Sequence, residues 1–374
     1  HPFLSEKTCR KALCPPEWLD LRRDSSLYTI MKSPLVVAPG SINVDLILKT
    51  TSLKGPKTFH GDYAESQGGK GSNQAIAARR AGTDDRDVYL VGCVGQDEWG
   101  AQALQVLRSS GVYTDYVRIH PQIRTGVVME YLYGDGEVTI ALDLGANAAV
   151  NTHDITTAGP HIESAAMLLA QIETSLDALE SALRRAHMAG VPTMLDPSIV
   201  PAAGSDRRRL LDEILPLIDL IAPNRSETQS LTDIDVTDDA SALRAAAQLH
   251  ERVPMVVITR GADGAVISRA EEHHILRGHV VDAIDAGAAG DTFRGALACA
   301  LAEALEAEQG PADGLAHLPF PALVAAAQFA NAAAALCVTR VGAAPSIPHR
   351  HEIENLLRSQ SAGILRPGTL GTGA

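Results

Sequence analysis

From Leu35 onward, short apolar runs alternate with longer amphipathic stretches, and this alternation constrains the fold more than any other feature of the chain. Each run is closed by polar residues or by a Pro/Gly cluster, as expected of strands buried on both faces. The runs that predict strands are Leu35–Ala38, Val88–Val91, Ala166–Ala170, Thr193–Leu195, Leu220–Ala222 and Met255–Thr259.

The stretches between these runs have helical spacing, and several end at a glycine, the usual stop signal of a helix. They predict helices at Ser72–Ala81, Ala101–Ser110, Leu176–Ala189 and Ala240–His250. Strands that alternate with helices predict an α/β fold: a doubly wound, mostly parallel sheet with helices on both faces.

Two regions, residues 45–66 and 117–142, have the period-two alternation of half-exposed strands. The second contains Val127–Tyr133, followed by the turn residues Gly134-Asp135-Gly136. We expect antiparallel strands here that form a separate small sheet, placed to act as a lid. The main domain is expected to span residues 34–358.

The two ends of the chain read differently. Residues 1–33 mix charge, Pro and Cys without a continuous apolar run, so we expect no secretory signal but a poorly ordered extension, or a remnant of expression or processing with Met31 as the natural start. Residues 359–374 are rich in Gly, Ser and Thr and predict a flexible tail.

Charge and cysteine content restrict the partners. The net charge of −13 disfavours nucleic acid and anionic membrane surfaces. The most apolar stretch, Pro321–Val338, contains Gln328 and Asn331 and predicts a buried helix, not a membrane span. Five cysteines without a C-x-x-C pair indicate a reducing cytosol, so a cytoplasmic location is expected.

The strongest local signal is Gly287-Ala288-Ala289-Gly290-Asp291-Thr292-Phe293, which leads into a predicted helix at Arg294–Glu306. A small-residue loop that opens a helix points several backbone N–H groups at one spot, and that spot can bind an anion. Asp291 would then accept a proton beside a bound phosphate. In the alternative interpretation, Asp291 only caps the helix and the glycines only form a turn.

Two further clusters stand close to predicted elements. Gly68-Gly69-Lys70-Gly71-Ser72-Asn73-Gln74 runs into a helix and lets a ligand approach the backbone, but it is no P-loop because Ser or Thr does not follow Lys directly. In Gly40–Asp45, the side chains of Asn43 and Asp45 are two residues apart and share one face of an extended chain, which suits a vicinal diol. An Asx turn is the alternative for this pair.

Asn224-Arg225-Ser226-Glu227 and Ile258–Gly264 each follow a predicted strand, where α/β proteins bind ligands. Together with the three loops above, they make the chain resemble the ribokinase family of sugar kinases, also called the PfkB family, from about Leu35 to Pro348. Gly68–Gln74 matches the N-terminal signature of that family, Asp285–Phe293 its C-terminal signature, and Asn224 with Glu227 its Asn-x-x-Glu motif.

The resemblance implies a role for each matching position. Asp291 would be the catalytic base, and the backbone of Ala288, Ala289 and Gly290 would stabilise the transferred phosphoryl group. The residues implied to hold the sugar are Asn43, Asp45, Gly69, Lys70, Asn73, Glu173 and Asp291. Those implied to lie around ATP and Mg²⁺ are Asn224, Glu227, Thr259, Gly261, Gly264, Gly290 and Asn331. Those implied to hold an activating K⁺ are Asp285, Gly287, Cys337, Arg340, Gly342 and Ser346.

Two departures adjoin the predicted cation loop: Ala286 replaces the usual Thr, and Gly287 replaces a residue with a side chain. They put the potassium dependence in question. The pair Asn43/Asp45, the Lys70 loop and Glu173 resemble the pattern for ribose. Deoxyribose, a ketohexose or adenosine as substrate stays open, as does a non-catalytic binding protein on the same fold. The exposed lid edge also predicts a homodimer formed through the lid.

Overall fold

The computed structural model describes residues 32–50, 60–133, 138–308 and 314–361. Most of the predicted N-terminal extension and of the predicted tail lies outside these residues, so both stay predictions, as do the domain bounds 34–358. Cys9 and Cys14 also lie outside the described part of the chain.

The main sheet has nine strands in the order β13-β12-β11-β10-β9-β8-β1-β4-β5. All neighbours from β11 to β5 pair in parallel, while β12 and β13 add an antiparallel edge. The strand bounds are β1 Leu35–Val37, β4 Val88–Gly95, β5 Tyr113–His120, β8 Met167–Gln171, β9 Thr193–Asp196, β10 Leu220–Ile221, β11 Met255–Thr259, β12 Ala265–Arg269 and β13 Glu272–Leu276. The six predicted strands are all present, and the mostly parallel sheet is confirmed.

Side chains of the central strands alternate between two cores. Leu35 and Val37 of β1 join one hydrophobic cluster, and Val36 between them joins the other. Because successive side chains of a strand point to opposite faces, each face of the sheet must be covered. The two clusters are those layers.

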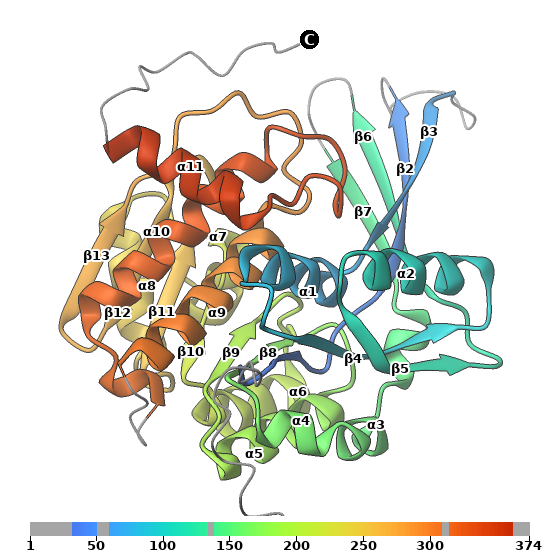
Figure 1. Cartoon of the computed structure of the whole chain (residues 1–374), viewed down its shortest axis with the longest axis horizontal. Coiled ribbons are helices and arrows are strands. Elements are labelled where there is room, and N and C mark those ends of the chain that lie inside the picture. Colours follow the sequence, from blue (N-terminus) through green and yellow to red (C-terminus); the bar gives the residue numbers. More distant parts are fainter. Residues whose placement is uncertain (1–31, 51–59, 134–137, 309–313, 362–374) are drawn as a thin grey trace, which may run out of the picture. The chain divides into compact units, whose positions relative to one another are not determined.

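Helices cover both faces (Figure 1). Those that pack on the Leu35 face are α1 Lys70–Ala81, α2 Glu98–Ser109, α9 Ala289–Ala307, α10 Phe320–Cys337 and α11 Arg350–Ser361. Those that pack on the Val36 face are α3 Thr152–Thr157, α4 Gly159–Glu163, α5 Leu176–Ala189, α7 Arg225–Thr232 and α8 Asp239–Leu249, while α6, Gly204–Arg209, has no buried residue.

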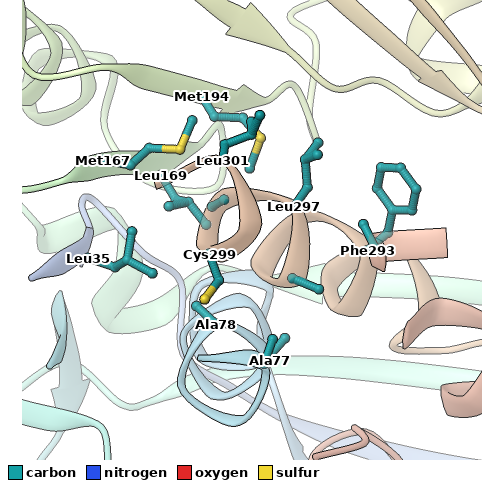
Figure 2. Close-up of a cluster of buried hydrophobic side chains, with 14 of the residues drawn as sticks. Leu35, Ala77, Ala78, Met167, Leu169, Met194, Phe293, Leu297, Cys299 and Leu301 are labelled. Carbon is teal, nitrogen blue, oxygen red and sulfur yellow. The ribbon is translucent and has the colours of Figure 1, made fainter. Parts of the chain in front are cut away.

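Helices α1 and α9 cross at very short range, and this crossing positions the candidate site. A Cβ atom added at Gly295 of α9 would lie 2.5 Å from the carbonyl oxygen of Gln74 and 2.6 Å from Cβ of Ala77, both in α1. Figure 2 shows Ala78 of α1 beside Cys299 of α9, below the strand residues Met167 and Leu169. Only glycine at position 295 allows the two backbones to approach this closely.

The lid is a separate four-stranded sheet in the order β3-β2-β6-β7, drawn at the upper right of Figure 1. Its strands are β2 Asn43–Thr50, β3 Asp62–Gly68, β6 Gly126–Tyr133 and β7 Val138–Asp143. The prediction of purely antiparallel strands was wrong at the centre, where β2 and β6 pair in parallel. Residues 117–120, which we had assigned to the lid, belong to β5 at the edge of the main sheet, because this strand pairs with β4.

Helix α10 is the one described helix that is long and apolar enough to cross a membrane. Half of its residues are buried within the protein, and it packs against α9, as the prediction of a buried helix requires. Cys299 and Cys337 are buried free thiols.

Candidate functional site

Asp291 is the third residue of α9 and is buried at the start of the helix. Two side-chain amides from α1 hold its carboxylate: Asn73 Nδ2 donates to Oδ2 over 2.9 Å, and Gln74 Nε2 donates to Oδ1 over 3.1 Å. The N-cap of α9 is Ala288, so the interpretation of Asp291 as a helix cap was wrong. Its carboxylate is oriented by α1, at the positive end of the α9 dipole.

The loop before Asp291 carries the backbone N–H groups that were predicted to bind an anion. The N–H groups at the start of a helix have no acceptor within that helix, so they are available to a bound anion. Ala289 N–H donates to the carbonyl of Ala286 over 3.2 Å. This hydrogen bond must break before the N–H group can bind a phosphoryl oxygen. Gly290 follows directly, beside the guanidinium of Arg294.

A buried polar network fixes the amide of Gln74. Its Nε2 also donates to Asp196 Oδ2 over 2.7 Å, and its Oε1 accepts from Gln171 Nε2 over 2.8 Å. Gln74 therefore has one orientation in which every bond is made, and its second N–H points to Asp291. The orientation of the candidate base therefore depends on Asp196 and Gln171, which act on it through Gln74.

Arg294 completes this network one turn along α9. Its guanidinium lies 3.2 Å from Asp196 Oδ1 and 2.9 Å from Glu227 Oε2, and its Nε donates to the carbonyl of Ala222. Burial alone would lower the pKa of Arg294, but the carboxylates of Asp196, Glu227 and Asp291 raise it. Burial raises the pKa of Asp196, which Arg294 and Lys70 oppose. Lone buried charges are costly, and here they balance one another.

The glycine-rich loop brings the start of β2 against α1. Gly69 is the N-cap of α1 and has a φ of 92°, which favours glycine. A Cβ atom at Gly69 would lie 2.6 Å from the backbone nitrogen of Asn43, and one at Gly71 would lie 2.5 Å from Cα of Gly40. These close contacts place Asn43 and Lys70, which are far apart in the sequence, at one site.

The predicted sugar-binding side chains have buried or half-buried positions around this loop. Asn43 Oδ1 accepts from Asn147 Nδ2 over 2.7 Å. Glu173 Oε2 accepts from the hydroxyl of Ser41 over 2.6 Å. Burial and, less strongly, the negative charges of Glu130, Asp291 and Glu173 raise the pKa of Asp45 to about 7.

Lys70 is the cation of this group. Burial would lower its pKa, but the carboxylates of Asp291, Asp196 and Glu173 raise it, so the ammonium stays charged. Burial also raises the pKa of Glu173, while Lys70 and the bond from Ser41 lower it. The site therefore combines one ammonium with several carboxylates and amides, a set of donors and acceptors that suits the hydroxyl groups of a sugar.

The predicted nucleotide residues surround the ends of β10 and β11. Asn224 is the N-cap of α7 and forms a capping box with Glu227, whose carboxylate also binds Arg294. Thr259 ends β11 and forms a β-bridge with Asn224. Gly261 and Gly264, with φ of 62° and 86°, form the turn into β12. Asn331 lies in α10 and donates to the carbonyl of Arg277 over 3.0 Å.

The predicted cation loop is closed by one carboxylate. Asp285 Oδ1 accepts from Gly287 N–H and Oδ2 accepts from Gly342 N–H, both over 2.9 Å. Cys337 Sγ and Ser346 Oγ lie 3.1 Å apart, and Ser346 also donates to the carbonyl of Ala343. The side chain of Arg340 is directed elsewhere, to Glu352 at 2.5 Å, so only its backbone is available to this loop.

Arg294, Asp196, Gln74 and Gln171 were not among the predicted site residues. A signal for Arg294 existed, because it is a single cation within the Ala-rich segment that follows Asp291. Asp196 likewise ends an apolar strand and precedes a proline. No pattern in the sequence could join these positions, since they come together only through the packing of α9 on the sheet.

Comparison with known proteins agrees with this geometry. Residues 33–350 match the pfkB family of carbohydrate kinases. A ribokinase of Haemophilus influenzae is 35% identical over 325 residues, which cover 86% of this chain and 97% of that protein. The solved ribokinase of Giardia lamblia superposes with a TM-score of 0.80 at 27% identity, covering 88% of this chain and 100% of the other.

A second solved structure, the ribokinase of Arabidopsis thaliana complexed with ribose and ATP, has a TM-score of 0.73 and 28% identity, with 88% of this chain and 99% of that chain covered. The family match extends over most of the chain, and the relatives are covered almost completely. The chain therefore belongs to the pfkB family of carbohydrate kinases.

Proposed function

We propose that this protein transfers the γ-phosphoryl group of ATP to the primary 5-hydroxyl of D-ribose, giving ribose 5-phosphate and ADP. One observation carries the proposal: the buried carboxylate of Asp291 is oriented by Asn73 and Gln74 at the start of α9. A proton acceptor and an anion-binding helix terminus thus stand at one point. The similarity to ribokinases, one of them complexed with ribose and ATP, supports ribose as the sugar.

Asp291 accepts the hydroxyl proton as the sugar oxygen attacks the γ-phosphorus in line. A carboxylate at a helix N-terminus is a weak base, so the proton moves late, within the transition state. Phosphoryl transfer needs little covalent help from a protein, and positioning supplies most of the rate. The lid sheet, which carries Asn43 and Asp45, excludes water from the bound sugar.

Backbone N–H groups of Ala288, Ala289 and Gly290 stabilise the charge on the transferred phosphoryl group. Among the described residues, no cluster of three or more His, Cys, Asp or Glu side chains could hold a metal ion. That fits Mg²⁺, which proteins bind through one or two carboxylates, the phosphates and water. Glu227 and Asn224 are the residues that would hold it, and Mg²⁺ there would neutralise phosphate charge.

The site residues Thr259, Gly261, Gly264 and Asn331 would surround the nucleoside of ATP. K⁺ would lie beside the loop that Asp285 closes through Gly287 and Gly342, as a monovalent activator. The closed geometry of this loop supports that role.

We also propose a cytoplasmic homodimer that associates through the lid. The lid exposes large apolar side chains, among them Ile140, Leu142 and Tyr63, and within the described residues its outer strands β3 and β7 each pair with a strand on one side only. Exposed edges and apolar patches favour association with a second copy.

The decisive experiment measures ADP release from Mg-ATP with ribose, deoxyribose, fructose or adenosine, each with and without potassium. We expect the largest kcat/KM with ribose. Turnover with another sugar alone would overturn the substrate, and binding without turnover across the panel would favour a non-catalytic binding protein.

Replacement of the base separates catalysis from binding. In Asp291→Ala, kcat should fall about 10²- to 10⁴-fold while ribose still binds in calorimetry. Asp235→Ala, at an exposed loop position, is the matched control and should keep wild-type turnover. Equal rates in the two variants would remove Asp291 from the mechanism.

A further inference from the structure

The register of the lid sheet identifies the residues that share a face with the sugar-binding pair. Asn43 is paired with Gly126, Asp45 with Val128, and Ile47 with Glu130. Residues directly opposite each other on neighbouring strands project to the same face. The inner lid face is therefore defined by Asn43, Asp45, Ile47, Val128, Glu130, Ile140 and Leu142.

Glu130 is a half-buried carboxylate in a mostly aliphatic part of this inner lid face. Ile47 and Ile140 are its cross-strand neighbours, and Val128 lies two residues before it on the same face. Within the described part of the chain, no hydrogen bond or ion pair to its carboxylate is formed. A partly buried carboxylate without a partner is costly, so this position favours a ligand that can donate a hydrogen bond.

Glu130 also acts on the site electrostatically. Its negative charge is the strongest of the charge effects that raise the pKa of Asp45, after burial itself. Burial, followed by the charge of Asp285, raises the pKa of Glu130. The charged groups that interact with Glu130 are Asp285, before the Gly287–Phe293 loop, and Asp45 of β2, while Lys49 lies further along β2 on the same face. Lys70, Glu173 and Asp291 act on Asp45.

We propose that Glu130 is a specificity-determining residue that accepts a hydrogen bond from a sugar hydroxyl facing the lid. This inference rests on the proposed sugar kinase activity and deepens it. The substrate class it selects is a sugar with a free hydroxyl on the lid side, in preference to the corresponding deoxy sugar. A site built to bind a hydroxyl discriminates against an analogue without it, because a buried acceptor is then left unpaired.

The test compares Glu130→Leu and Glu130→Gln with wild type on ribose, 2-deoxyribose and 3-deoxyribose. Wild type should prefer ribose over one of the deoxy sugars by about tenfold or more in kcat/KM. Glu130→Leu should lose most of that preference because its KM for ribose rises, while its kcat changes less than about twofold. Glu130→Gln should retain part of it, since its amide oxygen still accepts a hydrogen bond.

The matched control is Glu65→Gln on the other face of the lid. Glu65 is paired with Leu46, whose side chain projects away from Asp45. This variant should keep the wild-type preference for ribose. Loss of the preference in Glu65→Gln as well would show a general disturbance of the lid and would overturn the role of Glu130.

A second readout separates contact with substrate from a structural role. Loss of the charge at Glu130 should lower the pKa of Asp45, so the acid limb of the kcat/KM profile should move to lower pH in both Glu130 variants. An unchanged profile and an unchanged sugar preference would overturn the inference while wild-type turnover leaves the proposed function intact. Absence of wild-type turnover with every sugar would instead overturn the proposed function itself.

Discussion

The two sheets of this protein differ in how their side chains are satisfied. Strands β1, β8 and β9 of the main sheet are buried over their whole length, whereas the described side chains of β7 in the lid are exposed. The two side-chain hydrogen bonds that orient Asp291 come from α1, and Asp196 at the end of β9 in turn holds Gln74, whereas no described lid residue takes part. The candidate base is therefore preorganised independently of the lid, whose proposed part is to contact the substrate.

A buried side-chain amide helps to join the two regions. Asn147 lies in the short 3₁₀ helix Gly145–Ala149 after β7, where its Oδ1 accepts from Ile42 N–H and its Nδ2 donates to the Ile42 carbonyl and to Asn43. This buried amide anchors the base of the lid, next to the residues proposed to bind the sugar. Substitutions in the main domain should therefore affect stability strongly, and substitutions towards the lid tip should affect it weakly.

The sharpest test of this contrast is Arg294→Met. The change leaves Asp196 and Glu227 buried without their shared cation. Breaking a buried ion pair in this way costs about 3–5 kcal/mol in the free energy of unfolding. Chemical denaturation measures it, with Arg184→Gln as the control, because an exposed pair to Glu180 contributes less than about 1 kcal/mol. Equal stability of the two variants would contradict the buried network.

A smaller loss is expected from Gly295→Ala, which places a methyl group between α9 and α1. Overpacking of this kind costs about 1–3 kcal/mol and should shift Gln74 away from Asp291, so kcat should fall as well. Gly190→Ala is the comparison, since its Cβ meets nothing within 4 Å and only its φ of 71° strains an alanine. Activity equal to that of Gly190→Ala would show that the close crossing does not position the base.

Titration of Asp45, in the lid strand β2, should make both the free energy of unfolding and sugar binding depend on pH. Because its folded pKa of about 7 is above the ordinary 3.8, the unliganded fold favours the protonated carboxyl. Its contribution to stability is present below about pH 4 and is lost as the pH rises through about 7. Sugar binding by the ionised form should strengthen over the upper part of that window.

Two measurements check this prediction: kcat/KM for ribose and the free energy of unfolding, each between about pH 5 and pH 8.5. Asp45→Asn should flatten both profiles relative to wild type. A wild-type profile without an inflection near neutral pH would show that Asp45 keeps an ordinary pKa.

The smallest effect is expected at the lid tip. Ile140 is 60% exposed, so Ile140→Thr should change the free energy of unfolding by less than about 0.5 kcal/mol. Analytical ultracentrifugation of the same variant addresses the proposed dimer, which should dissociate more readily. A large loss of monomer stability would mean that the lid tip packs within its own chain.

The sequence predicted the buried core of the fold well because continuous apolar runs such as Leu35–Ala38 admit few other structures. It missed β5, β12 and β13, which lie at the edges of the main sheet, where polar residues interrupt the apolar pattern. The parallel pairing of β2 with β6 was also missed, since alternation shows which residues share a face but not the direction of the neighbouring strand.

Local motifs pointed to Asp291, Asn73 and Asn224. The structure joins Asp291 to Asn73 directly and links Asn224 to the same network through Glu227 and Arg294. The predicted site was incomplete where the support is tertiary. Arg294 and Asp196 are about 100 residues apart in sequence and meet only because α9 packs over the end of β9. Residues such as these, which act on the site through another polar side chain, belong to no local sequence motif that would identify them.

The buried chain of contacts that links Gln171, Gln74, Asp196, Arg294 and Glu227 also has an evolutionary consequence. Replacing any one member strands a buried charge or amide on another, so a single mutation is selected against even where it touches no substrate. Neutral drift can change these positions only by concerted substitution. Descendants of this chain should therefore keep all five together or exchange them as a set, while the lid surface diversifies freely.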